Sequence, residues 1–256
     1  MDLQFEKEIK QIAELINSAK NILFITGAGI SADSGLPTYR GIGGLYNDRN
    51  TDDGIPIEEA LSGRMLRQNP DITWRYIAQI EKSCRNASFN RAHQIIAEIE
   101  NKKRVCVLTQ NIDGFHIDAG SKNIIEIHGN IRKILCENCG FHELRSSYDG
   151  LHIPPACPEC SQIMRPEVVL FGEMLPENAI QRLEQELNSG FDVIFSIGTT
   201  SVFPYISGPV IIASRKGIPT VEINPSETEV SEIVDIKISA GAKISLEAIY
   251  NSLTGF

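Results

Sequence analysis

The chain has 256 residues, of which 42% are apolar and 22% charged, and its formal net charge is −9 at pH 7. These values match soluble globular proteins and argue against a disordered or fibrous chain. The acidic balance disfavours broad electrostatic binding to DNA or anionic lipid, so neither nucleic acid nor a membrane is an expected partner, whereas lysine-bearing peptides are compatible. No apolar run approaches the roughly 20 residues that cross a bilayer, and the start lacks the apolar segment of a secretory signal. The chain is therefore expected to be cytoplasmic.

The predicted elements begin with a helix and a buried strand. Phe5, Ile9, Ile12 and Ile16 recur at helical spacing, and the apolar run 21–26 follows them. Short apolar runs that favour strands recur at 105–109, 124–127, 168–171, 191–197, 219–223 and 234–238. Helical patterns between them occupy 91–100, 177–188, 205–216 and 244–253. Continuous apolar strands separated by helices predict a parallel sheet covered on both faces, so the predicted fold class is α/β.

Two segments interrupt this alternation of strands and helices. Residues 43–85 read as a polar loop followed by helices, and residues 131–164 carry four of the six cysteines. Together these two segments predict a smaller domain that is inserted into a larger one made of residues 1–42, 86–130 and 165–256. The cleft between the two domains is the predicted ligand site.

Four cysteines form two tight pairs, Cys136 with Cys139 and Cys157 with Cys160, and 17 residues separate the pairs. In a chain without an export signal, this spacing predicts a zinc site of four thiolates rather than disulfides. A closed tetrahedron has no open position for water, so the zinc is expected to be structural. A zinc ribbon that binds nucleic acid is the alternative, but the few basic residues nearby are too sparse for a phosphate track.

The first predicted strand runs directly into the sequence G-A-G-I-S-A at 27–32, which has the G-x-G-x-x-G/A spacing of a dinucleotide-binding turn. Glycines let backbone amides approach a pyrophosphate, and the N-terminus of a following helix favours negative charge. The alternative is a tight turn that needs glycine without any ligand. No strand ending in Asp or Glu arrives about 20 residues later, so NAD binding here would take an unusual form.

Four further polar clusters follow predicted strands, at 109–114, 126–130, 198–201 and 224–226. Because the carboxyl ends of parallel strands meet at one edge of a sheet, these clusters are expected to line one crevice. His128 is a candidate general base, since imidazole titrates near working pH. The alternatives are a helix cap for Asp113 and simple turns for the hydroxyl-rich loops. His93 and His116 lie in helix-like stretches and are expected to be packing or surface residues.

A series of short motifs runs along nearly the whole chain. In order, they are G-A-G-I-S at 27–31, G-L-P-T-Y-R at 35–40, T-Q-N-I-D at 109–113, H-G-N at 128–130, the two cysteine pairs, V-V-L-F-G-E at 168–173 and G-T-T at 198–200. The series resembles the sirtuins, which are NAD-dependent protein lysine deacylases. The resemblance implies a Rossmann-like large domain, a small domain made of a helical module and a zinc ribbon, NAD as co-substrate, and acylated lysine proteins or peptides as partners.

The resemblance also implies a role for each matching residue. The pyrophosphate region of NAD would be held by Gly27, Ala28, Gly29 and Ser31, with Tyr39 and Arg40 in a flexible cofactor loop. The nicotinamide ribose and its carboxamide would contact Gln110, Asn111 and Asp113. The adenosine half would contact Gly198, Thr199, Thr200 and Asn224. The substrate backbone would pair as an added strand with Val169, Leu170, Phe171 and Gly172.

The implied reaction transfers the acyl group to ADP-ribose. The substrate amide oxygen attacks C1′ of the nicotinamide ribose as nicotinamide leaves, a step that relies on positioning and is expected to need Asn111. His128 is expected to be the catalytic base that activates a ribose hydroxyl for acyl transfer, which yields acyl-ADP-ribose. A protein ADP-ribosyltransferase or an NAD hydrolase on the same fold is the alternative, and a non-enzymatic NAD-sensing or zinc-ribbon module is a third reading.

The chain also departs from the sirtuin pattern at several places. Leu170 replaces a frequent aromatic residue at the substrate tunnel, and the 198–204 loop is one residue shorter than in many relatives. Members that prefer negatively charged acyl groups carry a Tyr and an Arg after a Trp of the helical module, whereas Ile77 and Ile80 follow Trp74 here. Because no cation is available to pair with a succinyl carboxylate, acetyl or longer apolar acyl groups are the predicted substrates.

Overall fold

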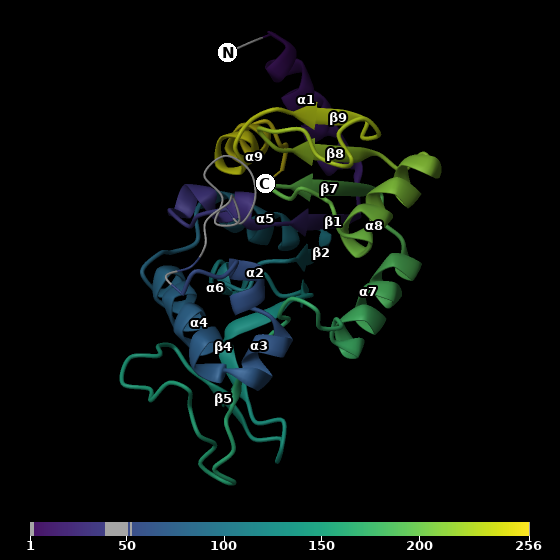
Figure 1. Cartoon of the computed structure of the whole chain (residues 1–256). Coiled ribbons are helices and arrows are strands. Elements are labelled where there is room, and N and C mark those ends of the chain that lie inside the picture. Colours follow the sequence, from purple (N-terminus) through teal and green to yellow (C-terminus); the bar gives the residue numbers. More distant parts are fainter. Residues whose placement is uncertain (1–2, 39–50, 52, 256) are drawn as a thin grey trace.

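The computed structural model describes residues 3–38, 51 and 53–255. Its centre is a six-stranded sheet with the strand order β3-β2-β1-β7-β8-β9 (Figure 1). The strands are β1 Asn21–Thr26, β2 Arg104–Thr109, β3 Ile124–Glu126, β7 Val193–Ile197, β8 Thr220–Ile223 and β9 Ile236–Ile238. Each neighbouring pair in this sheet runs parallel, which confirms the predicted α/β fold class.

The continuous apolar sequence of β1 follows from its burial on both faces. Ile22 and Phe24 belong to the apolar core on one face of the sheet, and Leu23 and Ile25 belong to the core on the other face. The first face is covered by α1 (Leu3–Ser18), α5 (Arg91–Glu100) and α9 (Ala242–Asn251), and the second by α7 (Glu177–Ser189) and α8 (Pro204–Arg215) (Figure 1). A strand between two helical layers has no polar face, so its sequence does not alternate.

The lower part of Figure 1 contains a second, three-stranded sheet with the order β5-β4-β6. Its antiparallel strands are β4 Gly129–Leu135, β5 His142–Leu144 and β6 Arg165–Val168. The helices α2 (Ile57–Ala60), α3 (Gly63–Gln68) and α4 (Pro70–Arg85) share an apolar core with this sheet, which we call the small core. The indole Nε1 of the fully buried Trp74 donates to Met164 O at 2.9 Å, so α4 is tied to the cysteine-bearing segment.

One predicted strand of the parallel sheet is wrong. The apolar run 168–171 was expected to join that sheet, but β6 ends at Val168 and pairs with β4 in the small sheet. Beyond it, the Phe171 N–H donates to Leu61 O at 3.0 Å, and Phe171 O accepts from the Gly63 N–H at 3.1 Å. The run is apolar because Val168 and Leu170 pack into the small core, so periodicity alone did not reveal which core they enter.

The structure also defines two short helices at the predicted strand ends. The helix expected after the glycine turn is a 3₁₀ helix, η1 (Ala28–Ser34). The helix-like stretch around His116 is a short helix, α6 (Phe115–Asp118), which follows β2. β4 crosses the predicted domain boundary at 130/131, and β6, which pairs with β4 in the small sheet, begins at Arg165 on the large-domain side of the boundary at 164/165. The division into domains itself stays a prediction. In the part of the chain that the structure describes, no helix combines the length and the apolar character that crossing a membrane requires.

Candidate active site and metal centre

The carboxyl ends of β1, β2, β3, β7 and β8 lie at one edge of the parallel sheet, where the five polar clusters follow them. Backbone hydrogen bonds join the clusters to one another. Gly27 N–H donates to Ile197 O at 3.0 Å, Gln110 N–H to Thr26 O at 3.0 Å, and Gly198 N–H to Ile223 O at 3.0 Å. The loops after neighbouring strands are therefore held in fixed register.

The glycines of the first turn are required by close packing against the loop after β7. A Cβ built on Gly27 would lie 2.8 Å from Gly198 O, and one built on Gly29 would lie 2.6 Å from Gly198 Cα. Gly198 itself has a φ of +60°, in the left-handed region that favours glycine. Close packing between the two loops therefore accounts for the glycines at 27, 29 and 198.

A buried polar network connects the turn after β1 with the loop after β2. The Ser31 hydroxyl donates to Asp113 Oδ2 at 2.8 Å, and Asn111 Nδ2 donates to Gly27 O at 3.1 Å and to Ser31 Oγ at 3.2 Å. Asp113 Oδ1 also accepts from the Phe115 N–H at 2.9 Å at the start of α6, as the helix-cap alternative expected. Burial raises the pKa of the Asp113 carboxyl, and the hydrogen bonds from Phe115 and Ser31 partly offset this.

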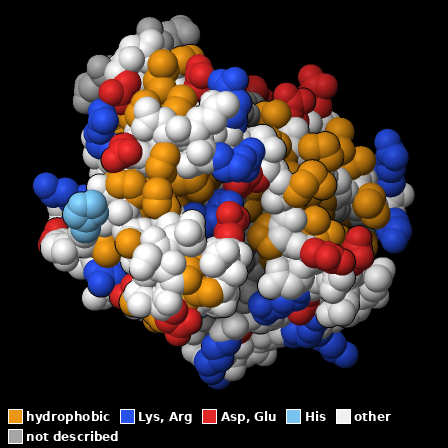
Figure 2. Space-filling model, turned by 60° about the horizontal axis from the view of Figure 1, so that its bottom comes forward, with side chains coloured by type: hydrophobic (Ala, Val, Ile, Leu, Met, Phe, Trp, Pro, Cys, Tyr) orange, Lys and Arg blue, Asp and Glu red, His pale blue; other side chains and the backbone are white. Residues whose placement is uncertain are grey.

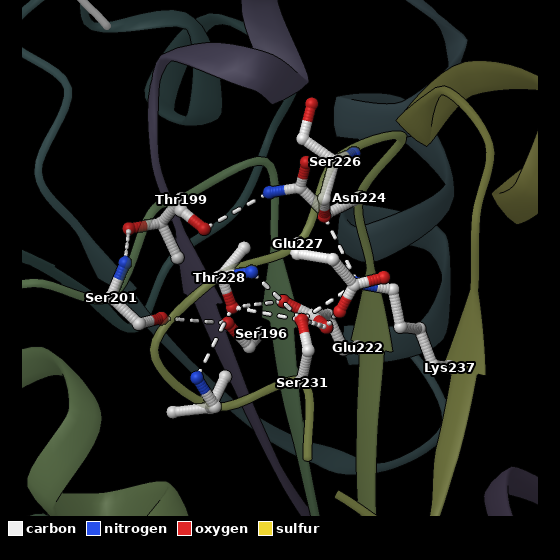
Figure 3. A network of polar contacts seen from close by, with 11 residues as sticks. Ser196, Thr199, Ser201, Glu222, Asn224, Ser226, Glu227, Thr228, Ser231 and Lys237 are labelled. Atoms are coloured by element: carbon white, nitrogen blue, oxygen red, sulfur yellow. Dashed lines mark hydrogen bonds and ion pairs between the residues drawn. The ribbon is translucent and has the colours of Figure 1, made fainter. Parts of the chain in front are cut away.

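Further hydrogen bonds fix the loop after β7. Gln110 Nε2 donates to Thr199 Oγ1 at 2.7 Å, and Asn224 Nδ2 donates to Thr199 O at 3.0 Å. Figure 3 shows Asn224 and Thr199 facing each other, next to a second set of contacts around Glu222. Three predicted NAD-binding residues from three strand ends thus contact one another.

Glu222 anchors the loop that follows Asn224. Its carboxylate is fully buried, accepts from Ser231 Oγ at 2.6 Å and from Thr228 Oγ1, and pairs with Lys237 Nζ at 3.1 Å (Figure 3). The sequence patterns do not single out this residue, because a charged side chain at the end of an apolar strand gives no sign of burial. The network fixes the backbone on which the predicted adenosine contact Asn224 lies.

His93 and His116 lie in the interior, next to Ser31 and Thr26 respectively, rather than at the surface. Both are buried, and their ring centroids are 4.9 Å apart. His93 Nδ1 accepts from the Asn90 N–H at 3.3 Å in the capping box of α5, while His116 Nε2 lies 3.0 Å from Thr26 Oγ1. Burial lowers the pKa of both imidazoles, that of His93 to about 4, so both stay neutral at pH 7. The packing expectation for this pair is therefore confirmed.

His128, which follows β3, is held from both sides of its ring. Its Nδ1 lies 3.0 Å from Gln110 O, and its Nε2 lies 2.7 Å from the Tyr205 hydroxyl. Burial lowers the pKa of His128, although the hydrogen bond to Gln110 opposes this, so the imidazole is neutral near pH 7. Tyr205 was not among the predicted site residues. In the sequence it stands only as the first residue of a predicted helix, directly after the shortened 198–204 loop.

The segment predicted to bind substrate runs past His128. The Val169 N–H donates to His128 O at 2.9 Å, and the Leu170 N–H donates to Glu173 Oε2 at 2.9 Å. The Phe171 N–H donates to Leu61 O. Among the four residues 169–172, Gly172 is the one whose N–H has no hydrogen-bond partner within the described part of the chain. Leu170 is buried in the small core, so its replacement of an aromatic residue acts on packing. The role of all four residues in binding substrate stays a prediction.

A groove of about 490 Å³ lies at the free edge of β3, between β6 and the start of α7. Several of its charges are already engaged, since Arg165 Nη2 pairs with Glu173 Oε2 at 2.7 Å and Arg182 Nη1 donates to Ile124 O at 2.7 Å. Figure 2 shows the molecule turned so that the bottom of Figure 1 comes toward the viewer. Acidic and basic side chains are interspersed on this face, and apolar side chains gather on both sides of a central hollow. Val169 is the one predicted site residue that lines this groove.

The four paired cysteines converge at the end of the small sheet. Their Sγ atoms all lie within 4.8 Å of one another, with 3.5 Å between Cys136 and Cys160 and 3.5 Å between Cys139 and Cys157. All six cysteines of the chain are free, so no disulfide competes. A tetrahedral zinc ion with Zn–S bonds of about 2.3 Å places its sulfurs about 3.8 Å apart, so the geometry fits a structural zinc.

Two predicted cofactor residues, Tyr39 and Arg40, lie outside the described residues. Of the remaining predicted NAD-binding positions, the structure brings those after β1, β2, β7 and β8 to one edge of the sheet, together with His128 after β3. The four predicted zinc ligands form their own cluster, and Cys136 directly follows β4 at the end of that strand away from His128.

Comparisons with known proteins agree with this architecture. Residues 27–204 match the profile of the Sir2 family. NAD-dependent protein deacylase 2 of Pseudomonas aeruginosa is 50% identical over 239 residues, which covers 91% of this chain and 93% of that protein. An NAD-dependent protein deacylase of Aquifex aeolicus is 36% identical over 235 residues, covering 91% and 95% of the two chains.

Solved structures show the same fold. A Sir2 homologue in complex with NAD superimposes with a TM-score of 0.83 at 34% identity, covering 95% of this chain and 93% of that one. A Sir2 protein in complex with a p53 peptide and NAD⁺ superimposes with a TM-score of 0.81 at 27% identity, covering 95% and 97%. The matches extend over both sheets and the strand-end edge. The chain therefore belongs to the Sir2 family.

Proposed function

We propose that this chain is an NAD-dependent protein lysine deacylase in which His128 is the general base. The observation that carries the proposal is the state of the His128 ring. Gln110 O can only accept a hydrogen bond, so Nδ1 carries the proton and Nε2 presents a lone pair at the edge of the sheet where the NAD-binding clusters meet. A neutral imidazole with this tautomer is what proton abstraction requires.

The residues of the strand-end network suit NAD as co-substrate. Asn111 Nδ2 is engaged by Gly27 O and Ser31 Oγ, whereas its Oδ1 forms no hydrogen bond with the described residues and is available to an amide donor such as the nicotinamide carboxamide. The carboxylate of Asp113 is held by Ser31, so both side chains are oriented before a ligand arrives. Side chains that are oriented in advance hold the reactants in the reacting geometry at no further entropic cost. Such positioning supplies rate to the loss of nicotinamide at a site that has no nucleophile of its own.

The proposed sequence of steps uses these groups in turn. The acyl-lysine amide oxygen attacks C1′ of the nicotinamide ribose and nicotinamide leaves, with Asn111 positioning the reacting ribose. His128 Nε2 then takes the proton of a ribose hydroxyl, whose oxygen attacks the amide-derived carbon. Water completes the transfer, which leaves a free lysine and acyl-ADP-ribose. The zinc site takes no part in this chemistry, since its four thiolates would leave no open position on the metal.

The two positions that carry Tyr and Arg in desuccinylating relatives are apolar here. Ile77 is buried in the small core and Ile80 packs against it, so neither position offers a charge. The neighbouring Arg75 is held by Asp53 at 2.8 Å on the exposed side of α4. We therefore propose acetyl and longer apolar acyl groups as substrates, on acylated lysine proteins or peptides, with a cytoplasmic location as the accompanying prediction.

Product analysis tests the proposed function. Mass analysis of a reaction with NAD and an acetyl-lysine peptide is expected to show nicotinamide, the free lysine peptide and acetyl-ADP-ribose in equal amounts. The alternative activities give different products, because an ADP-ribosyltransferase yields ADP-ribosylated protein and an NAD hydrolase yields free ADP-ribose without loss of the acetyl group. Either of those outcomes would contradict the proposal.

A further inference from the structure

Tyr205 contacts the proposed general base. Its hydroxyl lies 2.7 Å from His128 Nε2, and the two rings meet nearly at right angles, with centroids 5.8 Å apart and an interplanar angle of 82°. Tyr205 is the second residue of α8, two positions after Phe203. None of the roles described above uses this side chain.

The direction of this hydrogen bond follows from the other side of the ring. Since Nδ1 donates to Gln110 O, Nε2 of the neutral imidazole can only accept, and the Tyr205 hydroxyl is the donor. An imidazole nitrogen has a single in-plane lone pair. The atom that would take a proton from a ribose hydroxyl is therefore already occupied in this structure.

The position of Tyr205 is built into the start of α8. Its ring stacks on Phe203, with centroids 5.4 Å apart and an interplanar angle of 12°, and Phe203 also contacts the edge of His128 with centroids 6.1 Å apart. Pro204 begins the helix, and Ile206, buried in the core beneath the sheet, anchors its first turn. A phenol held in this way is a defined part of the site and not a mobile surface side chain.

We propose that Tyr205 is a latch on the general base: its hydroxyl holds His128 Nε2 until the distal ribose of the bound nucleotide displaces it. The latch rests on the proposed role of His128, which it deepens. A ribose hydroxyl reaches Nε2 only after the Tyr205 hydroxyl has left, so one hydrogen bond is broken for each one formed. Nucleotide binding is weakened by that exchange, and the base is released only when a ribose is present.

The test compares two nucleotides on two proteins. ADP-ribose carries the distal ribose that would meet His128, whereas ADP lacks it. In Tyr205→Phe the ring and its stacking remain and only the hydroxyl is lost, so ADP-ribose is expected to bind about two- to tenfold more tightly than to the wild-type chain, the range of one ordinary hydrogen bond. Calorimetry is expected to show unchanged binding of ADP. The KM for NAD is expected to fall without loss of kcat.

Two controls separate the latch from other effects. Tyr250→Phe removes a phenol hydroxyl of α9 that lies beside Arg91 and Glu98 of α5 and is expected to change neither affinity. On a His128→Ala background, Tyr205→Phe is expected to have no effect on ADP-ribose binding, because there is no lone pair left to release. Thermal unfolding of each variant shows that the fold is kept.

The outcomes are distinguishable. Unchanged ADP-ribose binding in Tyr205→Phe would overturn the latch. Weaker binding or a lower kcat with nicotinamide release intact would also overturn it, since the hydroxyl would then contact the ribose or pass its proton to His128 as a relay. A different result would contradict the assignment of His128 as the base, namely full deacylation by His128→Ala. That result does not depend on how Tyr205→Phe changes nucleotide affinity.

Discussion

The edge of the parallel sheet and the small three-stranded sheet are held together by different forces. At the strand-end edge, polar side chains such as Ser31, Asn111 and Thr199 are fixed by hydrogen bonds that run from one strand end to the next. The small sheet also has side-chain hydrogen bonds, such as those of Arg165 with Glu173, but its interior is the apolar core around Trp74 and the four cysteines lie at its end. Hydrogen bonds of the first kind fix the orientation of polar side chains, whereas an apolar core and a metal cluster stabilise a module without orienting polar groups.

The largest expected effect separates the two regions by their dependence on zinc. In Cys157→Ser one thiolate is lost, so we expect loss of bound zinc and a destabilisation of the small sheet by several kcal/mol, while the parallel sheet keeps its slow amide exchange. Metal analysis and hydrogen exchange measure this. Cys106→Ala, in the core of the parallel sheet, is the matched control and is expected to retain zinc. Equal loss of protection in both sheets would contradict the contrast.

A glycine at the strand-end edge tests the close packing there. Gly198→Ala places a Cβ 2.5 Å from Ile30 N at a φ of +60°, so we expect a loss of about 3 kcal/mol or more of unfolding free energy, from strain plus a backbone clash. Gly217→Ala has a similar φ of +68° with nothing within 4 Å of the added Cβ, and is expected to lose only about 1 kcal/mol. Denaturant unfolding measures both values, and equal losses would show that packing across this edge is loose.

The proposed preference for apolar acyl groups over succinyl depends on Ile77 and Ile80 of α4. We expect kcat/KM to be at least about tenfold higher for a butyryl-lysine peptide than for the succinyl peptide, which has nearly the same length but carries a carboxylate, because apolar Ile77 and Ile80 occupy the two positions discussed above. Peptides of one sequence with the two acyl groups provide the comparison. Faster removal of succinyl than of butyryl would show that a cation reaches the pocket.

The smallest expected effect is a shift in pH dependence at the strand-end edge. Because the pKa of His128 is lowered below the ordinary value of 6.5, the neutral base persists into mildly acidic solution, and acyl transfer is expected to fall only as pH drops through a midpoint below 6.5. Nicotinamide exchange, which does not need the base, serves as the internal control and is expected to lack this limb. A midpoint above 6.5 would contradict the burial of the ring.

Much of the strand-end edge could be predicted from the sequence, because parallel strands place their carboxyl ends together and polar residues after an apolar run are visible in the chain. Gln110, Thr199 and Asn224 meet for this reason, as do Asn111 and Ser31. The zinc cluster could likewise be predicted from cysteine spacing.

Other features depend on contacts that no local pattern contains. The apolar run 168–171 looks like a strand of the large sheet, and only the hydrogen bonds of Phe171 to Leu61 and Gly63 place it beside the helical segment. Tyr205 contacts His128, which lies 77 residues earlier in the chain, and Glu222 is held by Ser231 and Lys237 from the segment that follows its strand. The side-chain types alone reveal neither the burial of Glu222 nor the contact with His128.

Substitution of His128 tests the central claim most directly. In His128→Ala, formation of acyl-ADP-ribose is expected to fall by at least about a hundredfold, while exchange of labelled nicotinamide into NAD is retained to a larger extent. His152→Ala, at an exposed position of the cysteine-bearing segment, is expected to leave both reactions unchanged. Full deacylation by His128→Ala would contradict the account.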